Sequence, residues 1–171
     1  MNTRPSLTAL AVSLVIAGAA HVTTAGLSAA SATASMPVSA TVSNNCTITT
    51  NPIAFGSYDP VVSNASANLD AAGAVIIACT RGAVTTLGLD TGANAASSEH
   101  RLALGGNFLT YEVYQDSSRS TVWGDSGAAL YNSGTAPSKD ARTFPVYGRI
   151  TGGQDVPAGS YTDTVVATVN F

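Results

Sequence analysis

The sequence predicts an all-β protein built as a β-sandwich, and three observations lead to this prediction. Apolar and polar residues alternate with a period of two over residues 30–48, which is the period of a β-strand. Short segments with the same alternation recur at intervals of about 8–12 residues, separated by turn-forming sequences. No helical period persists after the first 25 residues.

The length of 171 residues suits one domain preceded by a leader. Residues 1–25 have the features of a secretory signal peptide, because Arg4 is followed by an apolar run and then by small residues. We expect cleavage after Ala25, with Ala20 and Ala30 as alternative sites. The apolar run is too short to span a membrane, so the mature protein is expected to be exported and soluble.

The composition is low in charge. Charged residues make up 10% of the chain, and loss of the leader changes the formal net charge from −3 to −4, with six basic against ten acidic residues. No basic patch is available to nucleic acid. With 45% hydrophobic residues, the composition excludes disorder and is typical of exported β proteins that assemble.

Two cysteines, Cys46 and Cys79, remain after the leader, and an even count in an exported protein favours one disulfide. A structural zinc site would need four ligands, and no pair of histidines lies nearby to complete it. Closing a loop of about 33 residues would contribute roughly 3–4 kcal/mol in the chain-entropy model.

The first predicted element is the alternating row at residues 30–48. Its even positions are apolar except for Asn44, and its odd positions are polar except for Pro37. The row would run roughly 60 Å as one strand, whereas strands usually hold about 5–6 residues. A domain of about 140 residues has a radius of gyration of about 14 Å. Part of the row must therefore bend back or reach outside its own fold, as a connector between molecules would.

Shorter strands follow in order. Residues 62–72, 93–101 and 126–138 are expected to be loops, because they are polar or rich in small residues. The apolar positions of the expected strands are Ile53 and Phe55, then Val75, Ile77 and Cys79, then Leu87 and Leu89, then Leu109, Tyr111 and Val113, then Val122 and Trp123, and then Phe144, Val146 and Ile150.

The chain finishes with an alternating strand over residues 161–171. Most domains leave their last residues frayed, so a regular strand ending in Phe171 indicates an edge that something occupies.

Asp90-Thr91-Gly92 follows an apolar segment, as in a half-site of an aspartic protease. Such an enzyme needs two carboxylates that share a proton, and the chain has no second copy of the tripeptide. An Asp/Gly turn at the end of a strand is the preferred interpretation.

Other catalytic arrangements are weaker. His100 is the only histidine after the leader, and we expect it to be exposed in a polar loop without a nucleophile elbow. Glu112, Asp116 and Asp125 could pair for glycoside hydrolysis, but they are sparse and are expected at solvated turns. We therefore expect no enzyme, cofactor or metal site.

Trp123, together with Tyr111 and Tyr114, could form a sugar-stacking platform. A secreted monomeric sandwich that binds carbohydrate is therefore the alternative function, although such rings more often fill a core.

Six motifs, taken in order, resemble the spore coat protein U domain family over residues 36–171. This family includes the subunits of archaic, Csu-type chaperone–usher pili. The motifs are Ile53-Ala54-Phe55-Gly56-Ser57-Tyr58, Ala78-Cys79-Thr80-Arg81-Gly82, Tyr111-Glu112-Val113-Tyr114-Gln115-Asp116, Thr121-Val122-Trp123-Gly124-Asp125, Val146-Tyr147-Gly148-Arg149-Ile150 and Gly159-Ser160-Tyr161-Thr162-Asp163-Thr164-Val165.

The resemblance implies an immunoglobulin-like sandwich that lacks its last strand, so that each subunit exposes an apolar groove beside its carboxyl-terminal strand. In the family a periplasmic chaperone fills this groove first. At the outer-membrane usher, the amino-terminal extension of a neighbouring pilus subunit then replaces the chaperone strand. The resemblance thus implies a structural subunit of a surface pilus, used in adhesion or biofilm formation.

Carried onto this sequence, the resemblance divides the chain into a signal peptide at 1–25, a donor-strand extension at 26–37 and a sandwich domain at 38–171. Pro37 lacks the N–H that a strand paired on both sides would use, so the hinge is expected there. The expected donor side chains are Ala30, Ala32, Ala34 and Met36, and the expected acceptor groove consists of Val165, Ala167, Val169 and Phe171.

Overall fold

The computed structural model describes residue 26 and residues 29–171. The predicted signal peptide lies outside the described residues. In the described part no helix is long and apolar enough to cross a membrane. The elements are β1 (Cys46–Asn51), β2 (Leu69–Cys79), β3 (Val84–Leu89), β4 (His100–Leu104), β5 (Asn107–Tyr114), the short 3-10 helix η1 (Gly127–Ala129), β6 (Tyr131–Thr135), β7 (Arg142–Ile150) and β8 (Ala167–Asn170).

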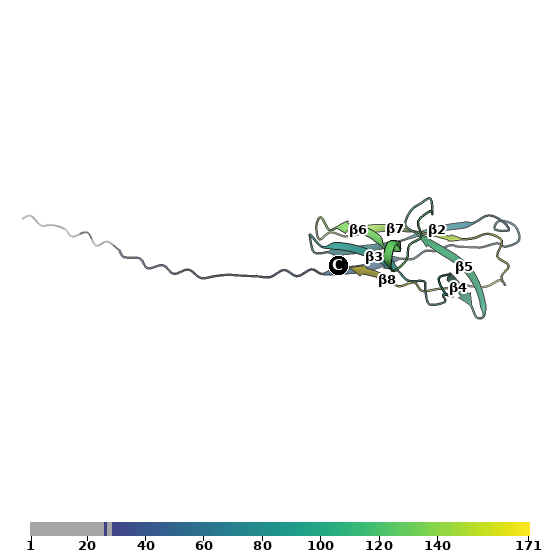
Figure 1. Cartoon of the computed structure of the whole chain (residues 1–171), viewed down its shortest axis with the longest axis horizontal. Helices are drawn as coiled ribbons and strands as arrows, with labels where there is room; N and C mark the ends of the chain where they lie inside the picture. The colour runs from purple at the N-terminus through teal and green to yellow at the C-terminus, as the bar shows by residue number, and fades with distance from the viewer. Residues whose placement is uncertain (1–25, 27–28) are drawn as a thin grey trace, which may run out of the picture. The chain divides into compact units, whose positions relative to one another are not determined.

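The strands form two antiparallel sheets (Figure 1). One sheet has the strand order β1-β2-β7-β5-β4, and the other has the order β6-β3-β8. The first and last strands are therefore each at the edge of a sheet. The predicted all-β class is confirmed, and the architecture is an immunoglobulin-like sandwich.

The core lies between the sheets and is centred on Trp123, which is fully buried. Its indole Nε1 donates to the carbonyl of Leu87 at 3.1 Å, and its ring stacks on Tyr131 at 4.8 Å between centroids. The indole thus fills the core and satisfies its only donor there. The indole offers no exposed face, so it takes the core position that was preferred over the alternative of a sugar-stacking platform.

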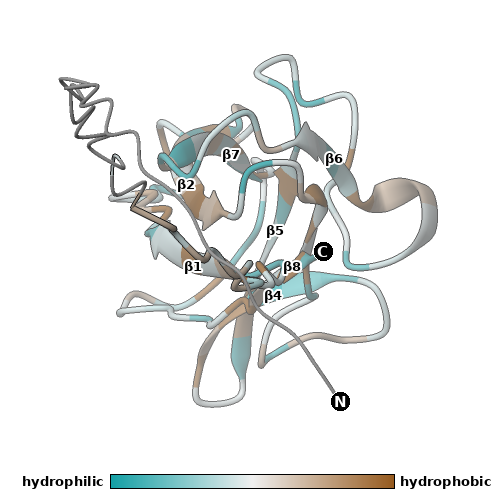
Figure 2. Ribbon diagram, turned by 90° about the vertical axis from the view of Figure 1, so that its left-hand side faces the viewer, coloured by the Kyte–Doolittle hydropathy of each residue, from teal (hydrophilic) through white to brown (hydrophobic). Residues whose placement is uncertain are grey.

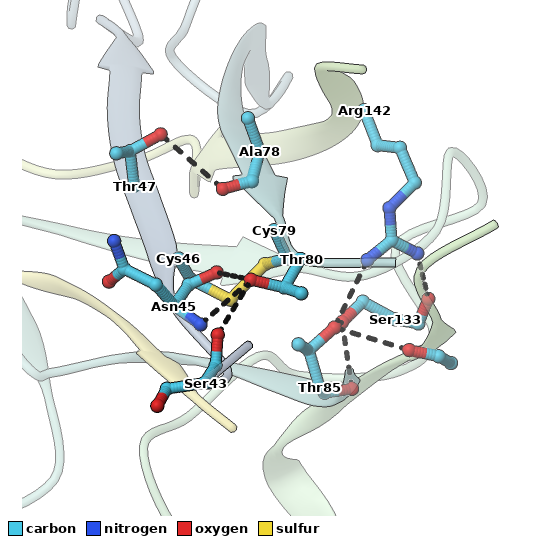
Figure 3. The surroundings of a disulfide bond; sticks show 11 residues. Ser43, Asn45, Cys46, Thr47, Ala78, Cys79, Thr80, Thr85, Ser133 and Arg142 are labelled. Carbon is cyan, nitrogen blue, oxygen red and sulfur yellow. Dashed lines mark hydrogen bonds between the residues drawn. A yellow bond between two sulfur atoms is a disulfide. The ribbon is translucent and has the colours of Figure 1, made fainter. Parts of the chain in front are cut away.

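The predicted disulfide joins Cys46 and Cys79 and is confirmed (Figure 3). The two residues are directly opposite in the first pair of the β1–β2 ladder, with their Cα atoms 4.1 Å apart. Next to them, Thr80 N donates to the carbonyl of Asn45 at 2.9 Å. β1 is an edge strand that pairs only with β2, so without the disulfide a single ladder would hold it. The disulfide adds a covalent link at the start of this strand.

Beside the disulfide, Arg142 ties the two sheets together (Figure 3). From β7 its guanidinium donates to the carbonyl of Ser133 at 2.7 Å and to Thr85 Oγ1 at 3.2 Å, which belong to β6 and β3. The hydroxyl groups of Thr85 and Ser133 also lie 2.6 Å apart and are buried. Buried polar groups are normally hydrogen-bonded, as these are. The bonds of the cluster connect β7 of one sheet to β3 and β6 of the other.

Three strands depart from the sequence prediction. β2 begins inside the segment expected to be a loop at 62–72, β4 begins at the end of the segment expected to be a loop at 93–101, and β6 lies in the one at 126–138. These segments form strands because they pair with neighbouring strands. β2 lies between β1 and β7, and β4 forms a hairpin with β5. Strand propensity depends strongly on such neighbours.

The long alternating row forms no strand over the described residues 29–45, and β1 starts only at Cys46. Within the row, only residues 46–48 belong to the subunit's own sheet. The apolar side chains of the row are exposed, with 85% for Met36, 89% for Val38 and 83% for Val42.

Candidate functional site

The candidate functional site is an open groove made of two adjoining hollows of about 330 and 600 Å³. Both hollows are lined by Ile53, Phe55 and Leu102, so they adjoin at these three side chains. Together they are called the groove, and its two walls are the segments 50–58 and 156–167.

The first wall begins where β1 leaves its sheet. Pro52 follows β1 directly and has no N–H to continue the ladder. The next apolar side chains then lie over two glycines of the five-stranded sheet. A Cβ on Gly73 would come within 2.8 Å of Ile53 Cγ1, and a Cβ on Gly148 within 2.7 Å of Phe55 Cζ. The two glycines therefore let this segment pack closely on the inner face of the sheet.

The second wall leads into β8. Its residues alternate between half-buried and exposed from Tyr161 to Asn170. The inward side chains Val165 and Ala167 are only half-buried, whereas Val75 and Val113 in the same core are 1% exposed. The apolar face of this wall is therefore incompletely covered.

Hydrogen-bonding groups accompany this uncovered face. β8 is an edge strand, and it lies side by side with β1, the edge strand of the other sheet (Figure 2). The N–H and C=O of Val166 both point toward Asp90, at 2.8 Å from its carboxylate and 3.1 Å from its amide. Because backbone groups alternate in direction along a strand, those of Val165 and Ala167 point to the open edge. Such an edge is a template for another strand.

The predicted site residues fall into two groups. Val165 and Ala167 line the groove, Val169 is half-buried against the core, and Phe171 is 54% exposed. The expected donor residues are all exposed and lie outside any strand: Ala30, Ala32, Ala34 and Met36.

The opposite wall was not predicted to belong to the groove. Ile53 and Phe55 were expected to form a strand, but neither lies in one, and their alternation was the available signal.

A polar cluster supports the second wall from behind. Asp163 accepts from the Tyr111 hydroxyl at 2.8 Å and from the backbone and side-chain nitrogens of Asn94 at 3.1 and 3.0 Å. Burial and the bond to this carboxylate raise the pKa of Tyr111 well above its ordinary value. Gly92 has a φ of +85°, and a Cβ there would collide with the Asp163 carboxylate. The cluster therefore holds Asp163 in one place.

His100 belongs to the same cluster and is 2% exposed, so the expectation of an exposed loop histidine was wrong. Its Nε2 lies 3.0 Å from the Asp90 carbonyl and its Nδ1 lies 3.1 Å from Glu112 Oε1. Burial by itself lowers the pKa of His100, but Glu112 and the Asp90 carbonyl outweigh it, so the pKa is raised above 6.5.

The residues considered for catalysis have structural contacts instead. The Asp90 carboxylate accepts from Gly92 N at 3.0 Å, which is the predicted Asp/Gly turn, and also from Val166 N. Asp116 is bonded within its own turn by Ser120 and Thr121. No group of three or more metal-ligating side chains was found among the described residues.

The fold and the open edge define a class of immunoglobulin-like domains with an unfilled strand position. The family model described as the Spore Coat Protein U domain matches residues 32–168. The chain belongs to this family, which confirms the family recognised from the motifs.

A relative and a solved structure are similar to the chain. It is 37% identical over 176 residues to Protein U of Myxococcus xanthus, covering 94% of this chain and 97% of that protein. It also resembles the CsuC-CsuE chaperone–tip adhesion subunit pre-assembly complex from archaic chaperone-usher Csu pili of Acinetobacter baumannii, with a TM-score of 0.55 and 24% identity. That match covers 77% of this chain but only 41% of the solved chain, and it shows the fold.

Proposed function

We propose that this protein is a structural subunit of a surface pilus that polymerises by donor-strand complementation. One observation carries the proposal: an apolar, half-covered wall ends at an open sheet edge, in a chain that also carries an exposed alternating row. Adding an extended segment to such an edge is β-augmentation, in which main-chain bonds give affinity and side chains in pockets give specificity.

The donor in this proposal is the row of a neighbouring subunit. Its expected side chains are Ala30, Ala32, Ala34 and Met36, and the exposed Val38, Ala40 and Val42 continue the same face up to the start of β1. The half-buried row from Tyr161 to Val169 would cover about 26 Å as a strand, and the exposed row before β1 is longer than that. The two rows share their period of two, so the donor row can span the whole wall.

The open strand edge also indicates which assembly partners the protein needs. An exposed strand edge beside apolar surface aggregates unless it is covered. We therefore include a periplasmic chaperone that covers the groove and an outer-membrane usher where a neighbouring subunit replaces it. The chaperone complex of the Csu tip subunit supports this by analogy. Export through the signal peptide at 1–25, and a role in adhesion or biofilm formation, belong to the same proposal.

The proposed role is not enzymatic and needs no cofactor. The engagement of Asp90, His100 and Glu112 in contacts that hold the groove supports this. The burial of Trp123 removes the reason for the carbohydrate-binding alternative.

Deletion of residues 30–42 tests the proposal. The chain is co-expressed with its chaperone and usher, and unheated samples are run on sodium dodecyl sulfate gels. Wild type should form ladders, whereas the deletion variant should accept a strand but donate none, so that it shortens wild-type ladders when mixed in. Full-length ladders from the deletion variant alone would contradict the proposal.

A further inference from the structure

The ring of His100 has an oxygen atom facing each of its nitrogens. The Asp90 carbonyl lies 3.0 Å from Nε2 and forms a hydrogen bond with it. Glu112 Oε1 lies 3.1 Å from Nδ1, which is an ion-pair distance, although Nδ1 makes no hydrogen bond. A neutral imidazole that donates from Nε2 would turn the lone pair of Nδ1 toward the carboxylate. An imidazolium instead places a positive charge beside it. Because the ring is 2% exposed, no bulk water can take over that contact, and the geometry therefore favours the charged ring.

The charged ring is connected to the groove through Asp90 and Tyr111. Asp90, whose carbonyl faces Nε2, forms a reciprocal pair of bonds with Val166, next to two groove-lining residues. Tyr111 packs against the His100 ring at 5.1 Å between centroids and donates to Asp163. Residues in contact with this one ring thus supply three of the hydrogen bonds that position the second wall, in addition to those from Ala93 and Asn94.

We propose that His100, as an imidazolium, positions the 163–167 wall of the groove, so that strand acceptance is strongest at acidic pH and weakens when the ring loses its proton. This role rests on the proposed function. His100 is a positioning residue, since it lines neither hollow of the groove.

The groups around the ring are mainly acidic. Glu112 faces it from β5, Asp90 from the end of β3 and Asp163 from the segment before β8. On its own strand, Arg101 is turned aside, because its Nε donates to the Asn94 carbonyl and its guanidinium lies 4.0 Å from the Phe108 ring centroid.

The sign of the pH dependence follows from these surroundings. Burial disfavours the charged ring, but Glu112 and the other acceptors reverse the effect, so the folded pKa lies above the ordinary 6.5. The stabilisation is then fully present below about pH 6.5 and is lost as the pH rises through the folded pKa. Apart from His21 in the predicted leader, no other histidine can produce such a transition.

The test measures the pH at which assembled chains of the mature protein lose half of their gel ladder during a fixed incubation. Glu112→Gln removes the charge that favours the imidazolium and should lower this midpoint by about one pH unit. Glu99→Gln makes the same change at the exposed residue beside His100 and should leave the midpoint near that of wild type. His100→Phe keeps a ring on Tyr111 and should remove the transition.

Each outcome decides a separate point. Ladders whose midpoint is unchanged in Glu112→Gln, or a transition that persists in His100→Phe, overturn the role of His100 alone. Solid-state ¹⁵N spectra of the assembled chain at pH 6 should show protons on both imidazole nitrogens, and a neutral ring would overturn the role as well. The absence of ladders at every pH overturns the proposed function and, with it, this role.

Discussion

Asp90 and Val166 hold each other by two hydrogen bonds, from Val166 N to the Asp90 carboxylate at 2.8 Å and from Asp90 N to the Val166 carbonyl at 3.1 Å. The same carboxylate oxygen also accepts from Gly92 N at 3.0 Å. A residue that resembles a protease half-site in the sequence is therefore a tie between β3 and the groove wall.

The tie predicts a difference between two substitutions of Asp90. Asp90→Ala leaves the N–H groups of Gly92 and Val166 without their acceptor and should lower the free energy of unfolding by about 1–3 kcal/mol. Asp90→Asn keeps an acceptor oxygen and should be milder, with assembly nearly unchanged. Urea unfolding of both variants measures the difference. Equal stability of Asp90→Ala and wild type would show that the tie contributes nothing, and a peptide-cleaving activity lost in Asp90→Asn would revive the protease hypothesis.

The disulfide predicts a loss of global stability on its removal, together with early loss of protection in β1. Replacing Cys46 and Cys79 by serine should cost roughly 3–4 kcal/mol, since the loop that it closes holds about 33 residues. In hydrogen exchange, β1 should lose protection first, because it pairs only with β2. Thiol titration of denatured, periplasmically produced protein should find no reactive thiol. Two reactive thiols would contradict the bond.

The glycine beneath the first wall provides a third prediction. A Cβ at Gly73 would lie 2.6 Å from the Asn51 carbonyl oxygen and 3.0 Å from the Pro52 carbonyl carbon, which are backbone atoms. Gly73→Ala should therefore push the wall from the sheet and destabilise the protein by about 1–3 kcal/mol. Gly106→Ala is the matched control, because a Cβ there meets nothing within 4 Å. Thermal unfolding compares the two, and equal midpoints would mean that the wall moves without cost.

The sequence predicted those features that depend on local alternation. Val146 and Ile150 were placed correctly on the inner face of a strand, and the two cysteines were paired correctly. The strand at 131–135 was missed because its pairing with β3, rather than its own residues Asn132 and Gly134, makes it a strand.

The candidate site could be predicted only in part for the same reason. The wall containing Val165 and Ala167 was identifiable from its alternation, although only residues 167–170 of the strand expected at 161–171 form β8. The burial of His100 was not, because it depends on Tyr111 and Glu112 of β5 and on Asp90, which follows β3 and is distant from them in the sequence. No pattern around a single histidine in a polar stretch predicts that arrangement.

The last prediction separates the donor face of the row from its polar face. Met36 and Val42 are two of the three large exposed apolar side chains in residues 29–45, and neither belongs to a strand. If they enter a neighbour's groove, Met36→Asp or Val42→Asp places a carboxylate in an apolar site, at several kcal/mol if it stays charged.

These variants should form few or no ladders in unheated gels, while their urea unfolding stays within about 0.5 kcal/mol of wild type because the side chains are exposed in the subunit. Ser35→Asp and Ser43→Asp carry the same charge on the opposite face of the row and should assemble nearly normally. Comparing Ala32→Asp with Val42→Asp then shows which end of the row enters the groove. A charge interrupts assembly only where it lies within the inserted segment. If Met36→Asp and Val42→Asp both give wild-type ladders, the row does not insert into the groove.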